Sequence, residues 1–200
     1  MTAGGTAADL PRRITLGTTA LTLRPMTSGD GEAMLAFARS LPPHDLLFLR
    51  RDITNADVVD QWLDDLDNGV TTVLATAGDR IHGYATVDRS LRMSWTAHLA
   101  ELRVLVSPDF RGQGLGRLLT DEAFRTALDM GVEKMIAQMT LDQQGAIEMF
   151  RRMGFEAEAL LKDHVKDRDG KKYDLVMMTH DVAAFAARAT ALGLGSALEE

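Results

Sequence analysis

One stretch, residues 99–131 (LAELRVLVSPDFRGQGLGRLLTDEAFRTALDMG), constrains the fold of this chain more than any other. Its first part carries apolar residues at every second position, which predicts a β-strand that ends at Pro108. Glycines follow at positions 112, 114 and 116, and behind them apolar residues recur at helical spacing as far as Gly131. The stretch therefore predicts a strand, a glycine-rich turn and a helix that begins on the glycines.

The glycine-rich turn has the features of an anion site. Glycine lacks a Cβ, so backbone N–H groups can approach a ligand, and the N-terminus of a helix attracts negative charge. The spacing excludes two common phosphate sites. A dinucleotide-binding fingerprint needs its third glycine one residue after Gly116, and a Walker A loop needs lysine where Arg117 stands. Either the turn binds a phosphate-bearing ligand of another kind, or its glycines serve only to turn the chain.

Composition limits the classes of function. The 200 residues suit one domain, and 46% hydrophobic with 26% charged residues is typical of a soluble globular protein. The net charge of −7 argues against nucleic acid or an anionic membrane as partner, because both require a basic face. The chain has no cysteine, and its five histidines lack metal-ligand spacing, so we expect no metal site. No apolar run is long enough to span a bilayer and no signal peptide is recognisable, so we expect a cytoplasmic protein.

Patterning along the chain predicts one mixed domain. Residues 1–13 are interpreted as a flexible tail, 14–180 as the folded domain and 181–200 as a C-terminal helix and tail, whose apolar face suggests a homodimer. Strands are expected at 19–24, 70–76, 80–87, 99–106, 132–140, 155–166 and 172–180, and helices at about 28–39, 54–69, 115–131 and 143–153. This order predicts an α/β (α+β) fold: a mixed, mostly antiparallel sheet of about six to seven strands with helices on both faces.

A second motif, residues 143–155 (QQGAIEMFRRMGF), follows some thirty residues after the glycine turn. Together the two motifs resemble the GNAT superfamily of acyl-CoA N-acyltransferases. Residues 111–116 (RGQGLG) match the family's [QR]-x-x-G-x-[GA] turn. Ala146, Gly154 and Phe155 match its N-x-x-A-x-x-x-Y-x-x-x-G-F helix. The order of elements from residue 19 to residue 180 is also similar to the family, so the resemblance implies the GNAT fold over most of the chain.

The resemblance implies acetyl-CoA as cosubstrate, in a V-shaped opening between the fourth and fifth strands of the family's sheet. It places the pantetheine arm beside Val104, Leu105 and Val106, and the pyrophosphate on the backbone N–H groups of the glycine turn. The other residues implied at the cofactor are Arg111, Gly112, Gln113, Gly114, Leu115, Gly116, Arg117, Gln143 and Phe150.

The chain departs from the family at residues that usually carry acid–base chemistry. Gln143 replaces the usual asparagine, and Gln138 lies near the position of a glutamate that is often present. Phe150 replaces the tyrosine that often protonates the departing thiolate, and a phenyl ring donates no proton. The N-terminal-alanine type of acid–base arrangement is therefore missing.

Glu101 is the remaining candidate general base. The run AELRVLV resembles the fourth strand of bacterial protein-lysine acetyltransferases, in which the glutamate takes the proton from the lysine amine. The alternative is a structural ion pair with Arg103, Arg80 or Arg92, and His98 is a weaker catalytic candidate.

The expected function is direct transfer of an acetyl group from acetyl-CoA to a primary amine, either a protein lysine or a small molecule. A carboxylate removes the proton from the amine, and a backbone N–H near Leu105 or Val106 polarises the thioester. The alternative from another class is a non-catalytic, acetyl-CoA-binding sensor module, because the tyrosine is missing at Phe150.

Overall fold

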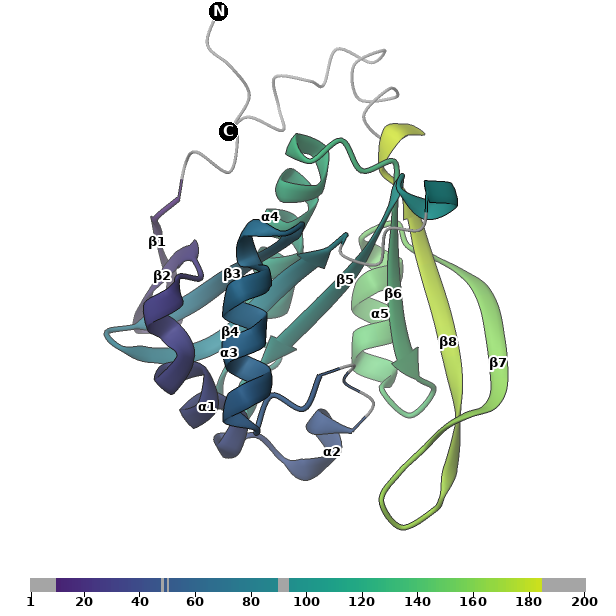
Figure 1. Cartoon of the computed structure of the whole chain (residues 1–200), viewed down its shortest axis with the longest axis horizontal. Coiled ribbons are helices and arrows are strands. Elements are labelled where there is room, and N and C mark those ends of the chain that lie inside the picture. Colours follow the sequence, from purple (N-terminus) through teal and green to yellow (C-terminus); the bar gives the residue numbers. More distant parts are fainter. Residues whose placement is uncertain (1–9, 48, 50, 90–93, 185–200) are drawn as a thin grey trace, which may run out of the picture.

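The computed structural model describes residues 10–47, 49, 51–89 and 94–184, which form one sheet of eight strands with helices on both faces (Figure 1). The strands lie in the order β1-β2-β3-β4-β5-β6-β8-β7. They are β1 (Arg12–Leu16), β2 (Thr19–Pro25), β3 (Val70–Ala77), β4 (Arg80–Asp88), β5 (Leu99–Val106), β6 (Lys134–Thr140), β7 (Glu156–Lys166) and β8 (Lys172–Asp181). The helices are α1 (Gly31–Ser40), α2 (Pro43–Leu46), α3 (Ala56–Asp64), α4 (Leu115–Asp129) and α5 (Gln144–Arg152), with short 3₁₀ turns at Ser28–Asp30, Asp65–Asp67, Ser94–Thr96 and Pro108–Phe110. The predicted α/β (α+β), mostly antiparallel fold is confirmed.

The described residues differ from the sequence prediction at both ends of the domain. The sheet has eight strands there, not six to seven, because β1 begins at Arg12, inside the predicted tail 1–13. Gly17 has a φ of 58° and turns β1 back onto β2, and Arg12 forms an ion pair with the buried Glu122 of α4. At the other end β8 continues to Asp181, and most of the predicted helix and tail at 181–200 lies outside the described residues.

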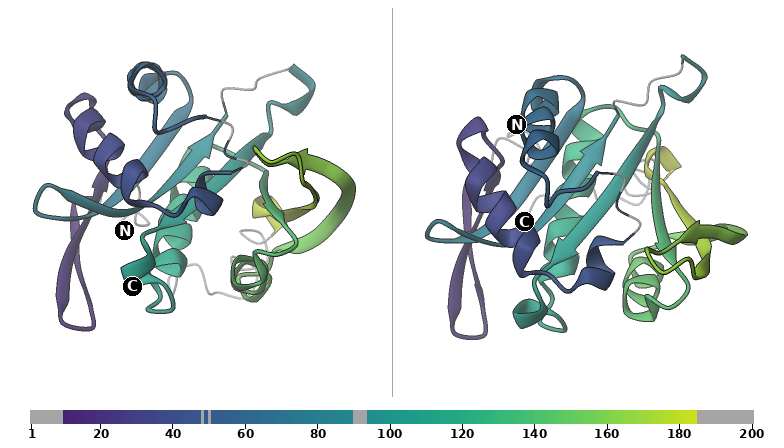
Figure 2. Two further views of the ribbon diagram at one scale, coloured as in Figure 1. Left: turned by 90° about the horizontal axis from the view of Figure 1, so that it is seen from below. Right: turned by 60° about the horizontal axis from the view of Figure 1, so that its bottom comes forward.

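Alternating strand residues supply two separate cores, one on each face of the sheet. Val73 and Ala75 of β3 belong to the core under α4 and α5, whereas Leu74 between them belongs to the core under α1 and α3. Trp62 of α3 packs edge-on against Tyr84 of β4 in the second core, with 5.2 Å between ring centroids. Figure 2 shows the helices distributed on the two sides of the sheet.

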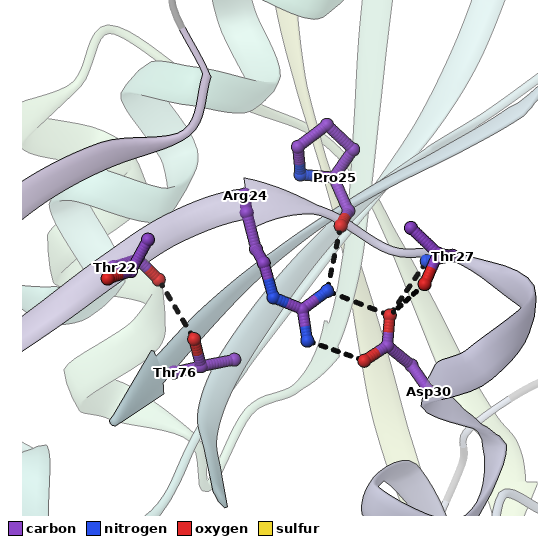
Figure 3. A network of polar contacts seen from close by, with 6 residues as sticks. All are labelled: Thr22, Arg24, Pro25, Thr27, Asp30 and Thr76. Carbon is purple, nitrogen blue, oxygen red and sulfur yellow. Dashed lines mark hydrogen bonds and ion pairs between the residues drawn. The ribbon is translucent and has the colours of Figure 1, made fainter. Parts of the chain in front are cut away.

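The start of α1 is fixed by a polar network around Asp30 (Figure 3). The Arg24 guanidinium donates to both carboxylate oxygens of Asp30, at 2.8 and 2.5 Å. The backbone N–H and the hydroxyl of Thr27 donate to the same carboxylate at 2.8 and 2.9 Å. Chiefly through the bonds from Arg24, the network lowers the pKa of Asp30 to about 2, so this buried group stays ionised.

The feature that positions the site is the contact between β5 and β6. They are the parallel pair of the sheet, connected through α4, and they pair only at Leu99–Lys134, Ala100–Met135 and Glu101–Ile136. Beyond Glu101 the two strands diverge, as Figure 1 shows. The sheet therefore opens in its middle, on the C-terminal side of Glu101.

Within the described part of the chain, no helix is long and apolar enough to cross a membrane.

Candidate active site

A cavity of about 250 Å³ fills the opening between β5 and β6. Residues 102–105 of β5 line one side, and residues 137–139 of β6 line the other. Four of the residues expected at the cofactor lie in this lining, namely Val104, Leu105, Gln143 and Phe150. Gln138, near the position of the family's glutamate, lines the cavity as well. Since β5 has lost its partner strand here, part of its backbone N–H and C=O edge faces the cavity. An extended ligand can therefore pair with β5 as a strand would.

The glycine turn lies directly after β5 and carries two backbone conformations that favour glycine. Gly112 has a φ of 71° and Gly114 a φ of 92°, and a Cβ on either would meet no atom within 4 Å. Glycine is therefore favoured at these two positions by the backbone conformation and not by tight packing. The helix hydrogen bonds of α4 begin at Leu118, whose N–H donates to Gly114 O at 3.1 Å. The N–H groups of the preceding turn have no acceptor within the helix, as an anion site requires.

The third glycine of the turn, Gly116, is favoured for a different reason. A Cβ on Gly116 would lie 3.1 Å from the sulfur of Met149 in α5 and 3.7 Å from Val106. Gly116 therefore allows α4 and α5 to pack closely. The side chain of Leu115 is fully buried in the core, which leaves only its backbone N–H for a ligand.

The polar side chains of the turn have different partners. Gln113 donates to the Asp109 carbonyl at 2.6 Å and so holds the turn together. Arg117 is 75% exposed and lies 4.0 Å from Asp121. Arg111 forms an ion pair with Asp45 of α2 and donates to the Val106 carbonyl at 3.4 Å.

The segment α2 borders the cavity on the side of the two strand ends. Asp45 contacts Arg111 after β5, and the His44 ring nitrogen lies 2.8 Å from an Asp142 oxygen after β6. Asp45, Leu47 and Leu49 all line the cavity. This segment carries no recognisable sequence motif. The two prolines at its start, Pro42 and Pro43, predict the end of the preceding helix and do not indicate what the chain then covers.

Glu101 lies on the face of β5 that points toward α1 and α3. It lines a second cavity of about 40 Å³, which we name the charged recess. The recess is lined by Leu49, Arg51, Ile53, Trp62, Tyr84, Thr86, Asp88, Glu101 and Arg103. Leu49 and Arg103 also line the larger cavity, so the two cavities adjoin there.

The carboxylate of Glu101 is engaged in the structure. Its side chain is 11% exposed and forms an ion pair with Arg103, which is one of the structural pairings expected as an alternative. Arg103 is two residues further along β5 on the same face, where both cavities meet. His98 is exposed and lines neither cavity, and Arg92 lies outside the described residues. Of the two candidate bases, Glu101 is therefore the one in a cavity.

Burial affects the protonation and the hydrogen bonding of the polar groups in the recess. Tyr84 is 2% exposed, and loss of water raises the pKa of its phenol to about 12, so the hydroxyl keeps its proton. Trp62 is 3% exposed, and its indole N–H has no hydrogen-bond acceptor among the described residues. Arg51 lies 2.7 Å from Asp65 through one terminal nitrogen and 3.8 Å from Asp88 through the other. Neither Arg51 nor Trp62 belongs to a recognisable sequence motif. The fold of the chain brings both residues to the recess at Glu101.

Phe150 and Gln143 have structural roles in the cavity wall. Phe150 is buried and packs edge-on against Phe155, with centroids 4.9 Å apart. The side-chain amide oxygen of Gln143 accepts a bond from the Thr140 N–H at 3.2 Å, which joins the end of β6 to the start of α5. Neither supplies a proton at the opening. Within the described ranges, no three His, Asp or Glu side chains are grouped as a metal site would need.

Comparison with known proteins agrees with this geometry. The chain matches the acetyltransferase (GNAT) family over residues 37–155. It is 30% identical over 112 residues to the L-amino acid N-acyltransferase MnaT of Escherichia coli, covering 56% of this chain and 59% of MnaT. It is also 30% identical over 84 residues to the Bacillus subtilis protein YwnH, named for phosphinothricin acetylation, covering 42% of this chain and 51% of YwnH. The chain thus spans little more than half the length of these relatives.

Among solved structures, the Salmonella typhimurium protein yncA, solved with its cofactor acetyl-CoA, superimposes with a TM-score of 0.70. The comparison covers 82% of this chain and 95% of yncA at 20% identity, and it shows likeness of fold. The family match includes α4, α5 and the divergent strands β5 and β6 between which the cavity lies. By its sequence match and its fold, this chain belongs to the acetyltransferase (GNAT) family.

Proposed function

We propose that this chain transfers the acetyl group of acetyl-CoA to a primary amine of a small molecule. The observation that carries the proposal is the separation of β5 and β6 beyond Glu101, which leaves a 250 Å³ cavity between the two strands. The glycine turn follows the end of β5, and the recess at Glu101 adjoins the cavity at Leu49 and Arg103. A thioester lying in that opening has its phosphates at one end and the carboxylate near the other.

The fit to acetyl-CoA rests on residues of this chain. The N–H groups at the start of α4, together with Arg111 and Arg117, supply donors and positive charge for a pyrophosphate. The unpaired edge of β5 from Leu102 to Leu105 supplies hydrogen bonds for the amide groups of a pantetheine arm. The structure of yncA with acetyl-CoA supports the same cosubstrate for this fold.

Glu101 is our proposed general base. An amine is protonated in neutral water and must lose one proton before its lone pair attacks the thioester carbonyl. The Glu101 carboxylate accepts this proton, directly or through a water molecule. A backbone N–H near Leu105 or Val106 stabilises the negative charge that develops on the carbonyl oxygen. The C–S bond then breaks, and the thiolate takes its proton from water or from the product ammonium, since Phe150 has none to give.

Two observations favour a small acceptor. The relatives MnaT and YwnH are named for an L-amino acid and for phosphinothricin. The recess at Glu101 is also small, with about 40 Å³, and suits an amine with one compact neighbouring group. A protein lysine, which the AELRVLV run suggested, is the competing acceptor and an outcome of the test.

The test is incubation with acetyl-CoA and a panel of amino acids, polyamines, aminoglycosides and lysine peptides. Release of free CoA is followed with a thiol reagent, and acetylated products are identified by mass spectrometry. We expect turnover with small amines. Turnover of lysine peptides alone would replace the small acceptor with a protein. Tight binding of acetyl-CoA without CoA release would identify a sensor module instead of an enzyme.

A further inference from the structure

We infer that the acceptor carries an anionic group beside its reactive amine, as an α-amino acid does, and that Arg51 binds this group in the charged recess. The inference rests on the proposed acetyl transfer and adds the acceptor's chemical class and the residue that selects it. It is carried by the polar side chains of the recess and by their partners.

The recess offers more donors than acceptors. Arg51, Arg103 and Trp62 are donor-only side chains, and Tyr84 keeps its hydroxyl proton. The acceptors are the carboxylates of Asp88 and Glu101, and both already have an arginine within ion-pair distance. Thr86 shares a 3.1 Å hydrogen bond with Thr72. A ligand that contributes negatively charged oxygens therefore complements this lining.

Arg51 is positioned to bind an oxyanion. Its side chain is 27% exposed, and its contact with Asp65 at 2.7 Å fixes one terminal nitrogen. The other terminal nitrogen is 3.8 Å from Asp88, which is beyond hydrogen-bond distance. The guanidinium is thus oriented through Asp65 and has donors left for a carboxylate, whereas Arg103 is committed to the base Glu101.

Trp62 supplies an independent observation. Trp62 lines the recess, and its buried indole N–H lacks an acceptor among the described residues. A buried donor without a partner costs free energy, and an oxygen of a bound ligand would remove that cost. The side chains of Leu49 and Ile53 beside it exclude water, which strengthens the attraction between Arg51 and a ligand carboxylate.

Size and charge together define the acceptor. The recess has room for about three water molecules, which is the space of a carboxylate and an amine and not of a long chain. With its ammonium toward Glu101 and its carboxylate toward Arg51, a zwitterion adds no net charge to two arginines and two carboxylates. A purely cationic amine offers no oxygen to Arg51 or to the indole N–H of Trp62, so it uses only the carboxylates of the recess.

The experiment compares three forms of one acceptor: an L-amino acid such as leucine, its amide and its decarboxylated amine. We expect kcat/KM for the amino acid to exceed that for the decarboxylated amine by roughly 10- to 100-fold, the range of a hydrogen bond to a charged group. Arg51→Met should lower kcat/KM for the amino acid much more than kcat/KM for the decarboxylated amine, and so remove this preference. Arg51→Lys should restore part of it, because the charge returns without the planar fork.

Asp65→Asn is the matched control, since it removes the charge that contacts Arg51 but keeps the guanidinium. Its amino-acid preference should stay within a few-fold of the parent's. Acceptance of the amine and the amino acid at equal kcat/KM, or preference for polyamines or lysine peptides, overturns the inference and leaves the acetyl transfer intact. Failure to acetylate any amine in the panel contradicts the proposed function itself. Because the parent's own preference is the first readout, the inference is testable even if Arg51→Met does not fold.

Discussion

Arg111 of the glycine turn forms an ion pair with Asp45 of α2, so the arginine expected at the pyrophosphate is held by the segment that borders the cavity. Under the proposed assignment of Arg111 to the pyrophosphate, a ligand phosphate and the Asp45 carboxylate compete for one guanidinium. The proposal therefore links acetyl-CoA binding through this pair to the position of α2.

Asp45→Asn should tighten acetyl-CoA binding, because Arg111 no longer has to leave a carboxylate. Since Arg111 is 48% exposed, the pair is worth no more than about 1 kcal/mol, and the gain should be about two- to fivefold in Kd. Isothermal calorimetry measures it. Asp142→Asn, which removes the contact of His44 with the other strand end, is the control and should leave Kd nearly unchanged. Weaker binding by Asp45→Asn would show that Asp45 supports the site.

Gly114→Asp should weaken acetyl-CoA binding, because it places a negative charge on the turn proposed to hold the pyrophosphate, at a φ of 92°. Gly78→Asp is a matched control: its φ is 56°, and a Cβ there also meets no atom within 4 Å. Both substitutions should cost about 1 kcal/mol of stability through backbone strain. Only Gly114→Asp should raise Kd, by more than about tenfold. Equal affinities of the two variants would remove the turn from the cofactor site.

Gly116→Ala should be about 1 kcal/mol less favourable to stability than Gly145→Ala in α5, because its Cβ lies 3.1 Å from the sulfur of Met149, whereas a Cβ on Gly145 meets no atom within 4 Å. Both substitutions gain helix propensity, so the difference between them reports the contact. Urea unfolding measures both. Adding Met149→Ala to Gly116→Ala should relieve the contact, so the two changes should be non-additive. Additive effects would mean that α4 and α5 do not constrain each other here.

Glu101→Gln should lower the rate of acetyl transfer by roughly 10²- to 10⁴-fold with acetyl-CoA affinity little changed, since glutamine accepts no proton. Asp88→Asn removes another carboxylate of the recess and should lower the rate far less. Phe150→Tyr should gain less than about tenfold, because the site is packed around a phenyl ring. Full activity of Glu101→Gln on the true acceptor contradicts the assignment.

Stability should fall in acid through Asp30. Its pKa is lowered from 3.8 to about 2 in the fold, so its contribution is complete above pH 4 and is lost as the pH falls toward 2. The difference corresponds to about 2 kcal/mol. Asp30→Asn should lose about this amount at pH 7 and depend less on pH between 4 and 2. Urea unfolding at several pH values tests this, with the exposed Asp60→Asn as control. An unchanged pH dependence would show that the Arg24 network does not stabilise the ionised form.

The elements that could be predicted from the sequence are those whose structure depends on residues close together in the chain. The strand, glycine turn and helix from Leu99 to Asp129 form from local alternation, φ preference and helical spacing, and the structure has all three. The strand β1 escaped prediction because it is five residues long, half exposed and recognisable only by its pairing with β2. Packing determined the role of Gly116, which its position in the glycine motif concealed.

The charged recess could not be predicted, because its members come from distant parts of the chain. Arg51 precedes Asp88 and Glu101 by some tens of residues, and no spacing rule connects it to them. Strand alternation places Glu101 and Leu102 on opposite faces of β5. It does not predict which helices cover each face. Only the packing of α3 on that face brings Trp62 to Glu101.

The divergence of β5 and β6 has a consequence for solubility. Unpaired strand edges normally lie at the border of a sheet, where they recruit strands of other molecules and promote aggregation. In this chain β5 has such an edge in the interior of the sheet, with α2 and α5 in the walls of the gap. A strand of another protein chain, with its side chains, is too bulky for a gap of about 250 Å³. The fold thereby keeps a hydrogen-bonding edge available to a thin ligand without the aggregation that an exposed edge would promote.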